Sequence, residues 1–460
     1  MTEDEVLRLI GKTADEIGYE CYVVGGYVRD KLLSLPNNDI DIVVVGKGET
    51  IARAYHSKVG GKLEIFQNFG TAMVNDGEWE VEFVGARKES YKRGSRKPIV
   101  EEGTLQDDQL RRDFTINAMA ICLNSSRYGE LVDPFNGQED LKKGIIRTPV
   151  DPCTTFSDDP LRMLRCVRFA TRFGFSIEPQ TFQGIQKVKD RIAIISPERI
   201  HSELLKIIGS DRVVEGIGYL KNSGLLEIIL PELTNLDTTD SDSGKRHKNN
   251  YVHTLQVLEN IIPMSKYNPW LRLAALLHDI GKTKAKRLGE KGWTFHSHDV
   301  YGEEMTEKIF RRLHLPLDEK LDYVKCLVRM HMRPQIISHE GLTDSAVRRL
   351  LHDAGDWIDD LLILARADIT TRFEDKRAFL IDQYNKLDIL IEDLKKRDFK
   401  RLFQPCLNGD DIMKLTGLPQ GEKIGVIKDM LKEAILDNLV ENEREALIKY
   451  MFEKIKGLGL

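Results

Sequence analysis

The spacing of hydrophobic and polar positions changes along this chain of 460 residues. Residues 1–20 carry apolar positions at helical spacing, which predicts an amphipathic helix. The apolar run 42–45 and the alternating segment 79–84 predict strands, and short helices and strands continue to about residue 147. From residue 158 onward, strand signals fade and helical periodicity dominates. The pattern therefore predicts an α+β protein with a mixed-sheet head and a mostly helical remainder.

Chain length and one polar segment suggest how the protein divides. A chain of this length usually forms two to four domains. The segment 241–247 is polar and contains glycine, so it is a candidate linker. We therefore expect four parts, namely a head at 1–147, a helical neck at 148–235, a helical domain at 245–375 and a helical tail at 376–460.

Composition and the N-terminal sequence indicate where in the cell the protein is expected. No stretch approaches 18 consecutive apolar residues, so no transmembrane helix is expected. The N-terminus is acidic and lacks the apolar core of a signal peptide. The six cysteines are scattered without CxxC spacing, which favours reduced thiols over a disulfide framework. These features predict a cytoplasmic protein that does not contact a membrane.

Charge is unevenly distributed. The net charge of −5 argues only against a uniformly basic nucleic-acid-binding surface. Two basic clusters stand out, and either is an ordinary solvated segment or a contact for RNA phosphates. The first comprises Arg87, Lys88, Lys92, Arg93, Arg96 and Lys97, and the second comprises Lys395, Lys396, Arg397, Lys400 and Arg401.

Two acidic residues begin the first strong apolar strand. Asp39 and Asp41 are two positions apart, so they project from the same face, about 7 Å apart. Such a pair can hold two Mg²⁺ ions that activate a hydroxyl and neutralise a leaving pyrophosphate. Upstream, Gly25 and Gly26 stand where a strand would turn into a helix, and there the backbone can approach a phosphate closely. The combination indicates nucleotidyl transfer, although each feature alone is also common in turns and at strand edges.

The string Gly25-Gly26-Tyr27-Val28-Arg29-Asp30, followed by Asp39-Ile40-Asp41, resembles the nucleotidyltransferase motif of the polymerase-beta superfamily. Its form is similar to that of the tRNA CCA-adding enzymes and poly(A) polymerases. The resemblance implies that Asp39 and Asp41 bind two Mg²⁺ ions and that Gly25, Gly26 and Arg29 bind the nucleotide. It also implies a third catalytic carboxylate at Glu82, which is otherwise a solvent-facing strand residue.

Residues 110–120 resemble the second motif of the same family. The pattern predicts two arginines at the start of an apolar helix, with Asp113 as an alternative N-cap. The resemblance implies that Arg111, Arg112, Asp113 and Asn117 contact the nucleotide, since arginine suits bidentate phosphate contacts. Residues 133–141 resemble the third motif, a turn that closes the head.

A helix is predicted to start near Pro160. One side of it carries Arg162, Arg165, Arg168 and Arg172, and the other side is apolar. Asp159 is well placed as an N-cap. The family resemblance implies another role, in which Asp159 and Arg162 read the incoming base through Watson–Crick-like hydrogen bonds and Arg165 and Arg168 serve the triphosphate. The chain has Asp158 where many relatives have Glu. The segment 197–205 resembles the neck-helix motif of the family, which implies that Glu198, Arg199 and Glu203 support this site through hydrogen bonds.

A second cluster follows an apolar, buried helix predicted at 270–277. His278 and Asp279 can both ligate one metal ion, although a lone buried histidine is more often structural. Together with His253 and Asp368 they resemble the ligands of HD-type metal phosphohydrolases, and His298 and His331 fall where binuclear members carry two more histidines. The resemblance implies a divalent transition metal or Mg²⁺ here.

The leading hypothesis is a template-independent enzyme that adds C, C and A to the 3′ end of tRNA from CTP and ATP, releasing pyrophosphate. The HD-type domain would add a metal-dependent phosphohydrolase activity. Alternatives are a poly(A) polymerase, an enzyme that adds only CC or only A, and a metal phosphohydrolase with an RNA-binding head. A non-catalytic RNA-binding module is disfavoured by the two sets of metal-type ligands.

Overall fold

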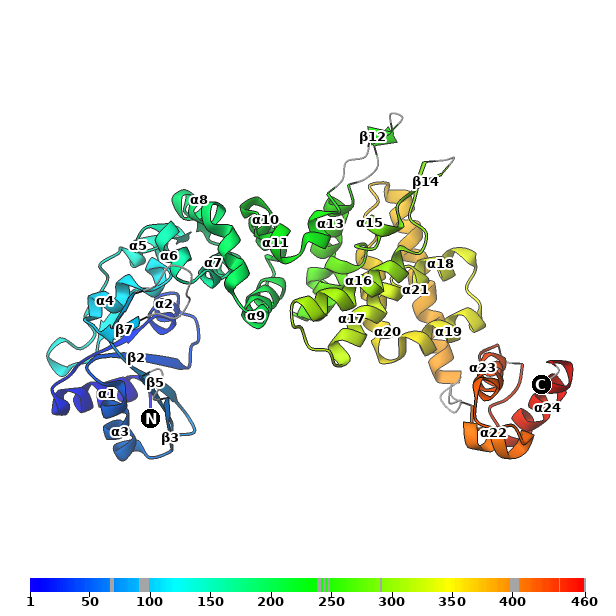
Figure 1. Cartoon of the computed structure of the whole chain (residues 1–460), viewed down its shortest axis with the longest axis horizontal. Coiled ribbons are helices and arrows are strands. Elements are labelled where there is room, and N and C mark those ends of the chain that lie inside the picture. The colour runs from blue at the N-terminus through cyan, green and yellow to red at the C-terminus, as the bar shows by residue number, and fades with distance from the viewer. Residues whose placement is uncertain are drawn as a thin grey trace. The chain divides into compact units, whose positions relative to one another are not determined.

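The computed structural model describes residues 1–66, 70–90, 99–237, 241–242, 245–246, 249–289, 292–397, 405–437 and 439–458. The chain forms two compact units, Met1–Pro231 and Glu232–Leu460 (Figure 1). The first unit holds a sheet followed by helices, and the second is mostly helical. This agrees with the predicted α+β class.

A mixed seven-stranded sheet organises the first unit. Its order is β3-β4-β5-β2-β1-β8-β9, and only the pair β2–β5 is parallel. The strands are β1 (Glu20–Val24), β2 (Asp39–Val45), β3 (Lys62–Phe66), β4 (Thr71–Asn75), β5 (Glu80–Gly85), β8 (Ala120–Cys122) and β9 (Leu131–Val132). A separate two-stranded sheet pairs β6 (Arg87–Ser90) with β7 (Ile99–Glu102).

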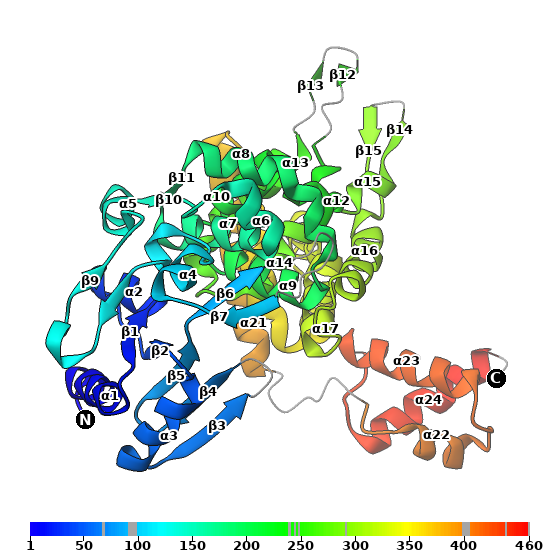
Figure 2. The same ribbon diagram turned by 60° about the vertical axis from the view of Figure 1, so that its left-hand side comes forward.

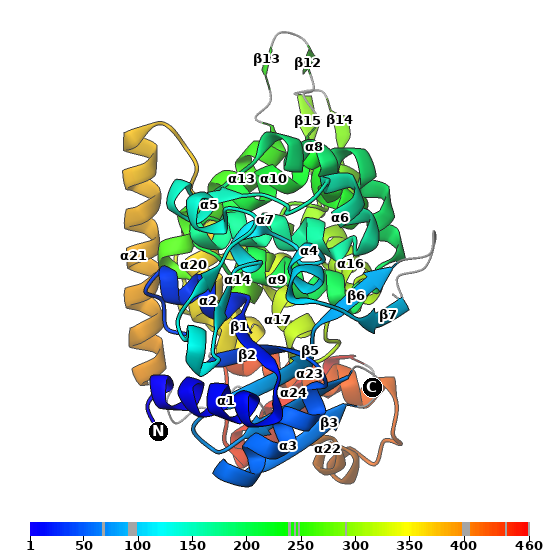
Figure 3. The same cartoon turned by 90° about the vertical axis from the view of Figure 1, so that its left-hand side faces the viewer.

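The strand β2 places its side chains on two different faces of the sheet. Ile40, Ile42 and Val44 are buried on one face, where α1 (Glu3–Ile17) and α3 (Gly48–Val59) pack against the sheet (Figure 3). Because strand residues alternate, Asp39 and Asp41 lie on the opposite face. The predicted helix in residues 1–20 is confirmed as α1.

The prediction of a helix after Arg111 and Arg112 is wrong. The helix α4 (Leu105–Leu110) lies before the arginines, and the apolar residues form a 3₁₀ turn, η2 (Thr115–Asn117), that leads into strand β8. The segment 114–120 is buried throughout. It therefore lacks the one-sided pattern of a surface helix, and a short buried run fits a turn and strand equally well.

The remainder of the first unit is mostly helical, as predicted. It also contains a short pair of parallel strands, β10 (Ile145–Ile146) and β11 (Ser176–Ile177). The turns and helices are η3 (Ser125–Arg127), α2 (Gly26–Leu32), α5 (Gly137–Lys143), α6 (Pro152–Asp158), α7 (Leu161–Phe173), α8 (Pro179–Val188), η4 (Lys189–Ile194), α9 (Pro197–Ile208), α10 (Val213–Ser223) and α11 (Leu225–Ile229).

The second unit is a stack of helices with two short hairpins that project from one end (Figures 1 and 2). The hairpins are β12 (Ser241–Asp242) with β13 (Lys245–Arg246), and β14 (Arg287–Gly289) with β15 (Gly292–Thr294). The first helices and turns are α12 (Pro231–Thr234), α13 (Asn250–Ile261), η5 (Ile262–Met264), α14 (Pro269–Leu277), α15 (Lys282–Ala285), α16 (His298–Arg312), α17 (Glu319–Met330), α18 (Arg333–Glu340), α19 (Asp344–Ala354), η6 (Gly355–Trp357) and α20 (Ile358–Ala367).

The chain continues through the long helix α21 (Glu374–Arg397), which packs against α18 and α19. The last helices are α22 (Gly409–Thr416), α23 (Glu422–Leu436) and α24 (Arg444–Leu458). They share an apolar core that includes Ile412, Leu431 and Leu447. Among the described residues, no helix combines the length and the hydrophobicity that a membrane crossing requires. The cytoplasmic location and the four-part division of the chain stay predictions.

Candidate active site and metal centre

Three candidate catalytic carboxylates lie on two adjacent strands. Asp39 and Asp41 are on β2, and Glu82 on β5 is the parallel register partner of Asp41. Register partners and residues two apart share a face of the sheet. Asp39 and Glu82 are exposed, and Asp41 is partly buried. The strands thus bring Glu82 beside Asp41, as the sequence predicted.

The crowded carboxylates change the acidity of Asp41. Its pKa is raised to about 6, first by burial and also by the negative charges of Glu82 and Asp39, while Arg112 opposes the rise. A cation between these oxygens would stabilise their ionised forms. Carboxylate oxygens are the ligands that Mg²⁺ prefers, so the donor set fits the predicted ion.

Gly25 lets a guanidinium approach the backbone beside the carboxylates. Its φ is +70°, and a Cβ there would lie 2.9 Å from Arg112 Nη1 and 3.7 Å from Asp41 Oδ2. A side chain would therefore be strained and would push Arg112 away. Gly26 begins α2 directly afterwards. The structure thus brings Gly25, Arg112 and Asp41 together.

Arg111 and Arg112 are both held by one buried carboxylate. Asp108, within α4, forms an ion pair with Arg111, and its Oδ2 accepts from Arg112 Nε at 3.0 Å. Burial alone would raise the pKa of Asp108, but the charges of Arg112 and Arg111 outweigh it and lower the pKa. The sequence reading missed Asp108, although it lies three and four residues before the arginines, a spacing typical of helical ion pairs.

A buried hydrogen-bond chain joins α2 to α7. Arg29 donates to Asp30 and to Asn117 Oδ1, each at 2.7 Å. Asn117 Nδ2 donates to Asp113 Oδ1 at 3.0 Å, and Asp113 Oδ2 accepts from Arg165 at 2.7 Å. Four predicted nucleotide-binding residues, Arg29, Asn117, Asp113 and Arg165, therefore lie in one network. Asp113 does not cap a helix, because its side chain accepts from Phe114 N before a 3₁₀ turn.

Asp159 lies just before α7, but Arg162 is not its ionic partner. Its carboxylate accepts from Leu161 N at 3.2 Å and pairs with Arg199 of α9 at 3.1 Å. Arg162 donates instead to the backbone carbonyls of Arg111 and Thr155, at 2.5 and 3.3 Å. Both side chains keep part of their surface accessible. The structure thus fixes the two separately, at the same end of the helix.

Arg168 meets the neck helix α9. Its Nε lies 3.1 Å from Glu203 Oε2, and both side chains are largely buried. The sequence predicted supporting contacts from Arg199 and Glu203, and both contacts are observed. In the first basic cluster, Lys92, Arg93, Arg96 and Lys97 lie outside the described residues, as do Lys400 and Arg401 in the second.

A pocket of about 470 Å³ opens beside the aspartates. Asp39, Asp41, Gly26 and Arg29 line it, as does Arg172 from the last turn of α7. Arg172 was predicted to share the arginine face of this helix, but no nucleotide contact was assigned to it. The pocket places nucleotide-binding and metal-binding residue types around one cavity.

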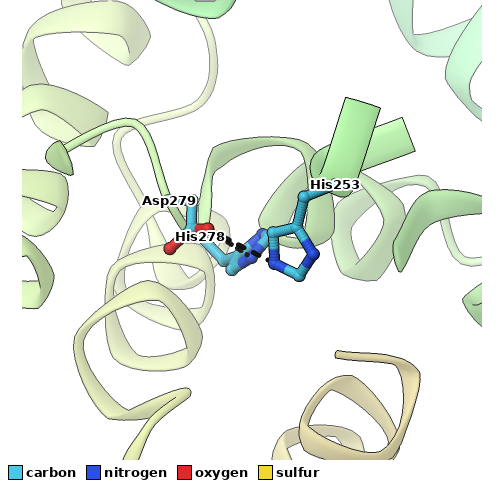
Figure 4. Close-up of side chains that lie close together, drawn as sticks. All are labelled: His253, His278 and Asp279. Atoms are coloured by element: carbon cyan, nitrogen blue, oxygen red, sulfur yellow. Dashed lines mark ion pairs between the residues drawn. The ribbon is translucent and has the colours of Figure 1, made fainter. Parts of the chain in front are cut away.

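The second cluster draws six side chains from five parts of the helical unit. Five of them follow or begin helices, and the sixth, His253, lies in the first turn of its helix, so the ends of helices form the site. His253 lies on α13, His278 and Asp279 follow α14, His298 begins α16, His331 follows α17 and Asp368 follows α20. Figure 4 shows His253, His278 and Asp279 directed toward one another. All the predicted ligands of this site therefore meet.

Asp279 lies between two groups of histidines. Its Oδ2 is 3.4 Å from His253 Nε2 and 3.3 Å from His278 Nε2. Its Oδ1 is 3.5 Å from His298 Nε2 and 3.8 Å from His331 Nε2. Asp368 Oδ1 adds a contact of 2.9 Å to His253. The arrangement offers two ligand sets that share one carboxylate.

Hydrogen bonds on the far side of three imidazoles fix their tautomers. Nδ1 of His278, His298 and His331 each lies 2.7–2.9 Å from a backbone carbonyl, of Ala275, Phe295 and Val328 respectively. A carbonyl only accepts, so each Nδ1 carries a proton, and in its neutral form each ring directs a lone pair on Nε2 into the cluster. His278 Nε2 is buried without a hydrogen-bond partner. Such inward lone pairs fit a divalent metal.

The charge states of His298 and His331 favour the same interpretation, because burial lowers the pKa of both. At His278, burial alone would lower the pKa, but Asp279 and Asp368 outweigh it and raise the pKa. Burial lowers the pKa of His331 to about 4, so its ring is neutral near pH 7. His298 Nε2 and His331 Nε2 lie 3.2 Å apart, and with both Nδ1 atoms protonated their lone pairs face each other. A shared cation would remove this repulsion. Lys282 also pairs with Asp279, at 2.5 Å.

Comparison with known proteins relates this geometry to described families. Residues 21–147 match the family model of the Poly A polymerase head domain. Residues 174–236 match the model described as a probable RNA and SrmB-binding site of polymerase A, and residues 250–373 match the HD domain. The three matches cover the sheet, the following helices and the histidine cluster.

Curated relatives align over most of the chain. The A-adding tRNA nucleotidyltransferase of Deinococcus radiodurans is 31% identical, with 90% of both chains aligned. The CCA-adding enzyme of Anoxybacillus flavithermus is 28% identical over 95% of this chain and 94% of its own. The A-adding tRNA nucleotidyltransferase of Halalkalibacterium halodurans is 38% identical, but the alignment covers 44% of this chain and 48% of that protein.

Solved structures share the fold. The Thermotoga maritima CCA-adding enzyme complexed with tRNA is 23% identical, with a TM-score of 0.62 over 98% of this chain and 95% of its own. The Bacillus stearothermophilus CCA-adding enzyme in complex with CTP is also 23% identical, with a TM-score of 0.64 over 100% and 99% of the two chains.

Proposed function

The chain belongs to the family of tRNA nucleotidyltransferases, and we propose that it adds C, C and A to the 3′ end of tRNA from CTP and ATP without a nucleic-acid template. The observation that carries the proposal is the cluster of Asp39, Asp41 and Glu82 beside Gly25 and the pocket of about 470 Å³. Relatives with the A-adding or CCA-adding activity align over most of the chain.

The carboxylates and the arginines have different proposed roles, metal binding and phosphate binding. Asp39 and Asp41, with Glu82 beside them, would hold two Mg²⁺ ions, which lower the pKa of the attacking 3′-hydroxyl and neutralise charge on the leaving pyrophosphate. Gly25 and Gly26 carry no side chain at the start of α2, so phosphates could approach the backbone there beside Arg112 and Arg29. Arg29 lines the pocket, and Arg112 lies beside Gly25. We assign Arg111, Arg165 and Arg168 to the same triphosphate, because guanidinium groups suit phosphate oxygens. Their pairing with Asp30, Asp108, Asp113 and Glu203 fixes them before the nucleotide binds.

Base selection is assigned to Asp159 and Arg162. Cytosine and adenine carry an exocyclic amine at corresponding positions, and a carboxylate can accept a hydrogen bond from it. A guanidinium can donate to acceptors on the ring. In the structure, Arg199 orients Asp159, and two backbone carbonyls orient Arg162. Both Nη atoms of Arg162 donate to these carbonyls, and its remaining N–H groups would contact the base in this proposal.

The histidine cluster is proposed to bind one or two divalent metal ions and to support a phosphohydrolase activity. His253, His278, Asp279 and Asp368 would form one ligand set, and His298 and His331 would extend it through Asp279. Bound metal would supply a hydroxide and polarise a phosphate ester. The cluster lies wholly in the second unit, whereas the transferase residues lie in the first.

A second candidate function is addition of A alone. It is favoured by the Deinococcus radiodurans and Halalkalibacterium halodurans relatives, which are both A-adding tRNA nucleotidyltransferases. The same carboxylates and arginines would serve either activity, so the two differ in which tRNA end is accepted.

The experiment uses tRNA transcripts that end before CCA, after C and after CC. Each receives Mg²⁺ with CTP, ATP or both, and the 3′ ends are sequenced. Stepwise extension that stops at CCA supports the proposal, and extension only of the transcript ending in CC supports the A-adding alternative. Long A tails identify a poly(A) polymerase. No extension by folded protein overturns the transferase assignment.

A further inference from the structure

On the arginine face of α7, Arg172 differs from the other three arginines because, among the described residues, neither a carboxylate nor a backbone carbonyl holds its guanidinium. Arg165 pairs with Asp113, and Arg168 pairs with Glu203. Arg162 is held by two backbone carbonyls. Arg172 is exposed, and among the described residues it forms no ion pair with a carboxylate. Its guanidinium carbon lies 5.1 Å from the centroid of the Phe173 ring.

This guanidinium lines the pocket that contains the catalytic aspartates. The same cavity is lined by Asp39, Asp41 and Arg29. Arg29 also lies over the ring of Phe173, at 4.9 Å, so one aromatic side chain supports two guanidinium groups. Stacking of this kind holds arginine side chains in place without neutralising them.

Three carboxylates and two guanidiniums line the pocket, namely Asp30, Asp39, Asp41, Arg29 and Arg172. Asp30 pairs with Arg29 and also accepts from Asn37, so it is not available to Arg172. Burial lowers the pKa of Arg29, and the nearby charge of Arg172 acts in the same direction. Asp39 and Asp41 are the proposed magnesium ligands. With metal bound to them, the cavity would be strongly cationic and suited to a polyanion.

We propose that Arg172 binds the terminal phosphates of the incoming CTP or ATP, the two that leave as pyrophosphate. The inference rests on the proposed function. The alternative for an exposed arginine in the last helical turn is a solvated side chain that only interacts with the helix dipole. Arg172 lies in the wall of the cavity with Arg29, and it has no acidic partner within the described part of the chain, which favours phosphate binding. The same phosphate chemistry exists in the RNA backbone, so the test separates the two sources.

The test compares CTP with CMP, which lacks the terminal phosphates. Binding of each to the full-length protein with Mg²⁺ is measured by calorimetry for the wild type, Arg172→Ala and Arg172→Lys. Loss of one charged hydrogen bond should weaken CTP binding about tenfold or more. CMP binding should not change, and Arg172→Lys should recover part of the CTP affinity. Arg53→Ala is the matched control, because Arg53 is exposed on α3 and pairs with Glu49 away from the pocket.

Steady-state kinetics identify the source of the phosphate. We expect Arg172→Ala to raise KM for CTP and for ATP about tenfold and to leave KM for tRNA unchanged. A rise in KM for tRNA alone would assign the arginine to the RNA backbone and overturn the proposal. Unchanged CTP binding, or an equal loss of CTP and CMP binding, would overturn it as well. Wild-type protein that binds neither CTP nor ATP would overturn the proposed function itself.

Discussion

At the scale of single residues, the candidate transferase site is built from arginines that are paired with acids. Asp108, Asp113 and Glu203 are all buried, and each holds at least one arginine of the site. Buried carboxylates are costly unless they are paired, so these arginines stabilise the fold as well as binding phosphate. A substitution here will change stability and activity together, and experiments must measure both.

Asp113→Asn should destabilise the first unit. The carboxylate bridges Asn117 and Arg165, and its replacement leaves the Arg165 charge without its partner. We expect a loss of about 2–3 kcal/mol, in the range for a broken buried contact and reduced because the Arg165 side chain is 35% exposed. Urea unfolding at pH 7 measures the loss. Glu139→Gln is the control, because its pair with Lys143 is exposed, and an equal effect of both variants would contradict the expectation.

Asp113→Asn should also make the stability of the protein less dependent on pH in the acidic range. Burial alone would raise the pKa of Asp113, but Arg165, Asn117 and Arg162 outweigh it and lower the pKa. A lowered pKa means that the stabilisation is present above the unfolded-state pKa of about 4 and is lost as the pH falls through the folded-state value. The wild type should therefore lose more stability than Asp113→Asn on acidification below about pH 4. Parallel thermal midpoints for the two proteins would count against this contribution.

At the scale of helices and strands, what the sequence could predict depended on local periodicity. Alternation along a strand is sufficient to place Asp39 and Asp41 on one face, and helical spacing is sufficient for the arginine face of α7. The segment 114–120 was mispredicted because it is buried on all sides and carries no period. The pairing of Asp159 with Arg199 joins residues 40 positions apart, which no local pattern specifies.

Close packing of two helices controls the geometry of the histidine cluster. Gly281 follows His278 and Asp279, and a Cβ there would lie 1.9 Å from the carbonyl oxygen of His298. It would also lie 2.5 Å from the nitrogen of Gly302, so α15 and α16 can approach only because position 281 has no side chain. The glycine thus keeps His298 within reach of Asp279.

Gly281→Ala should therefore impair metal binding. The added methyl group must separate the two helices, which moves His298 away from Asp279 and costs about 1–3 kcal/mol of stability. Metal content after dialysis and thermal unfolding test both effects. Gly425→Ala in α23 is the matched control, because nothing lies within 4 Å of its added Cβ, and it should stabilise the helix by about 0.5–1 kcal/mol. Unchanged metal content in Gly281→Ala would refute the role of this packing.

At the scale of the whole molecule, the two candidate sites occur in different compact units. The carboxylates of the transferase site belong to Met1–Pro231, and every ligand of the histidine cluster belongs to Glu232–Leu460. No residue is shared between the two sets of predicted ligands. Each site can therefore be removed by substitution without direct damage to the other.

Reciprocal variants test this independence. Asp39→Ala combined with Asp41→Ala should reduce nucleotide addition at least about a thousandfold, because both magnesium ligands on the strand are lost. The protein should stay folded, since removal of Asp41 also removes a carboxylate whose pKa is raised by burial. Metal bound at the histidine cluster should be unchanged. His278→Ala should give the opposite result, with loss of that metal and retention of nucleotide addition. The contradicting result would be that His278→Ala also abolishes nucleotide addition, although the unfolding transition of its first unit matches that of the wild type. The second unit would then be required for transfer, and the two sites would form one functional assembly.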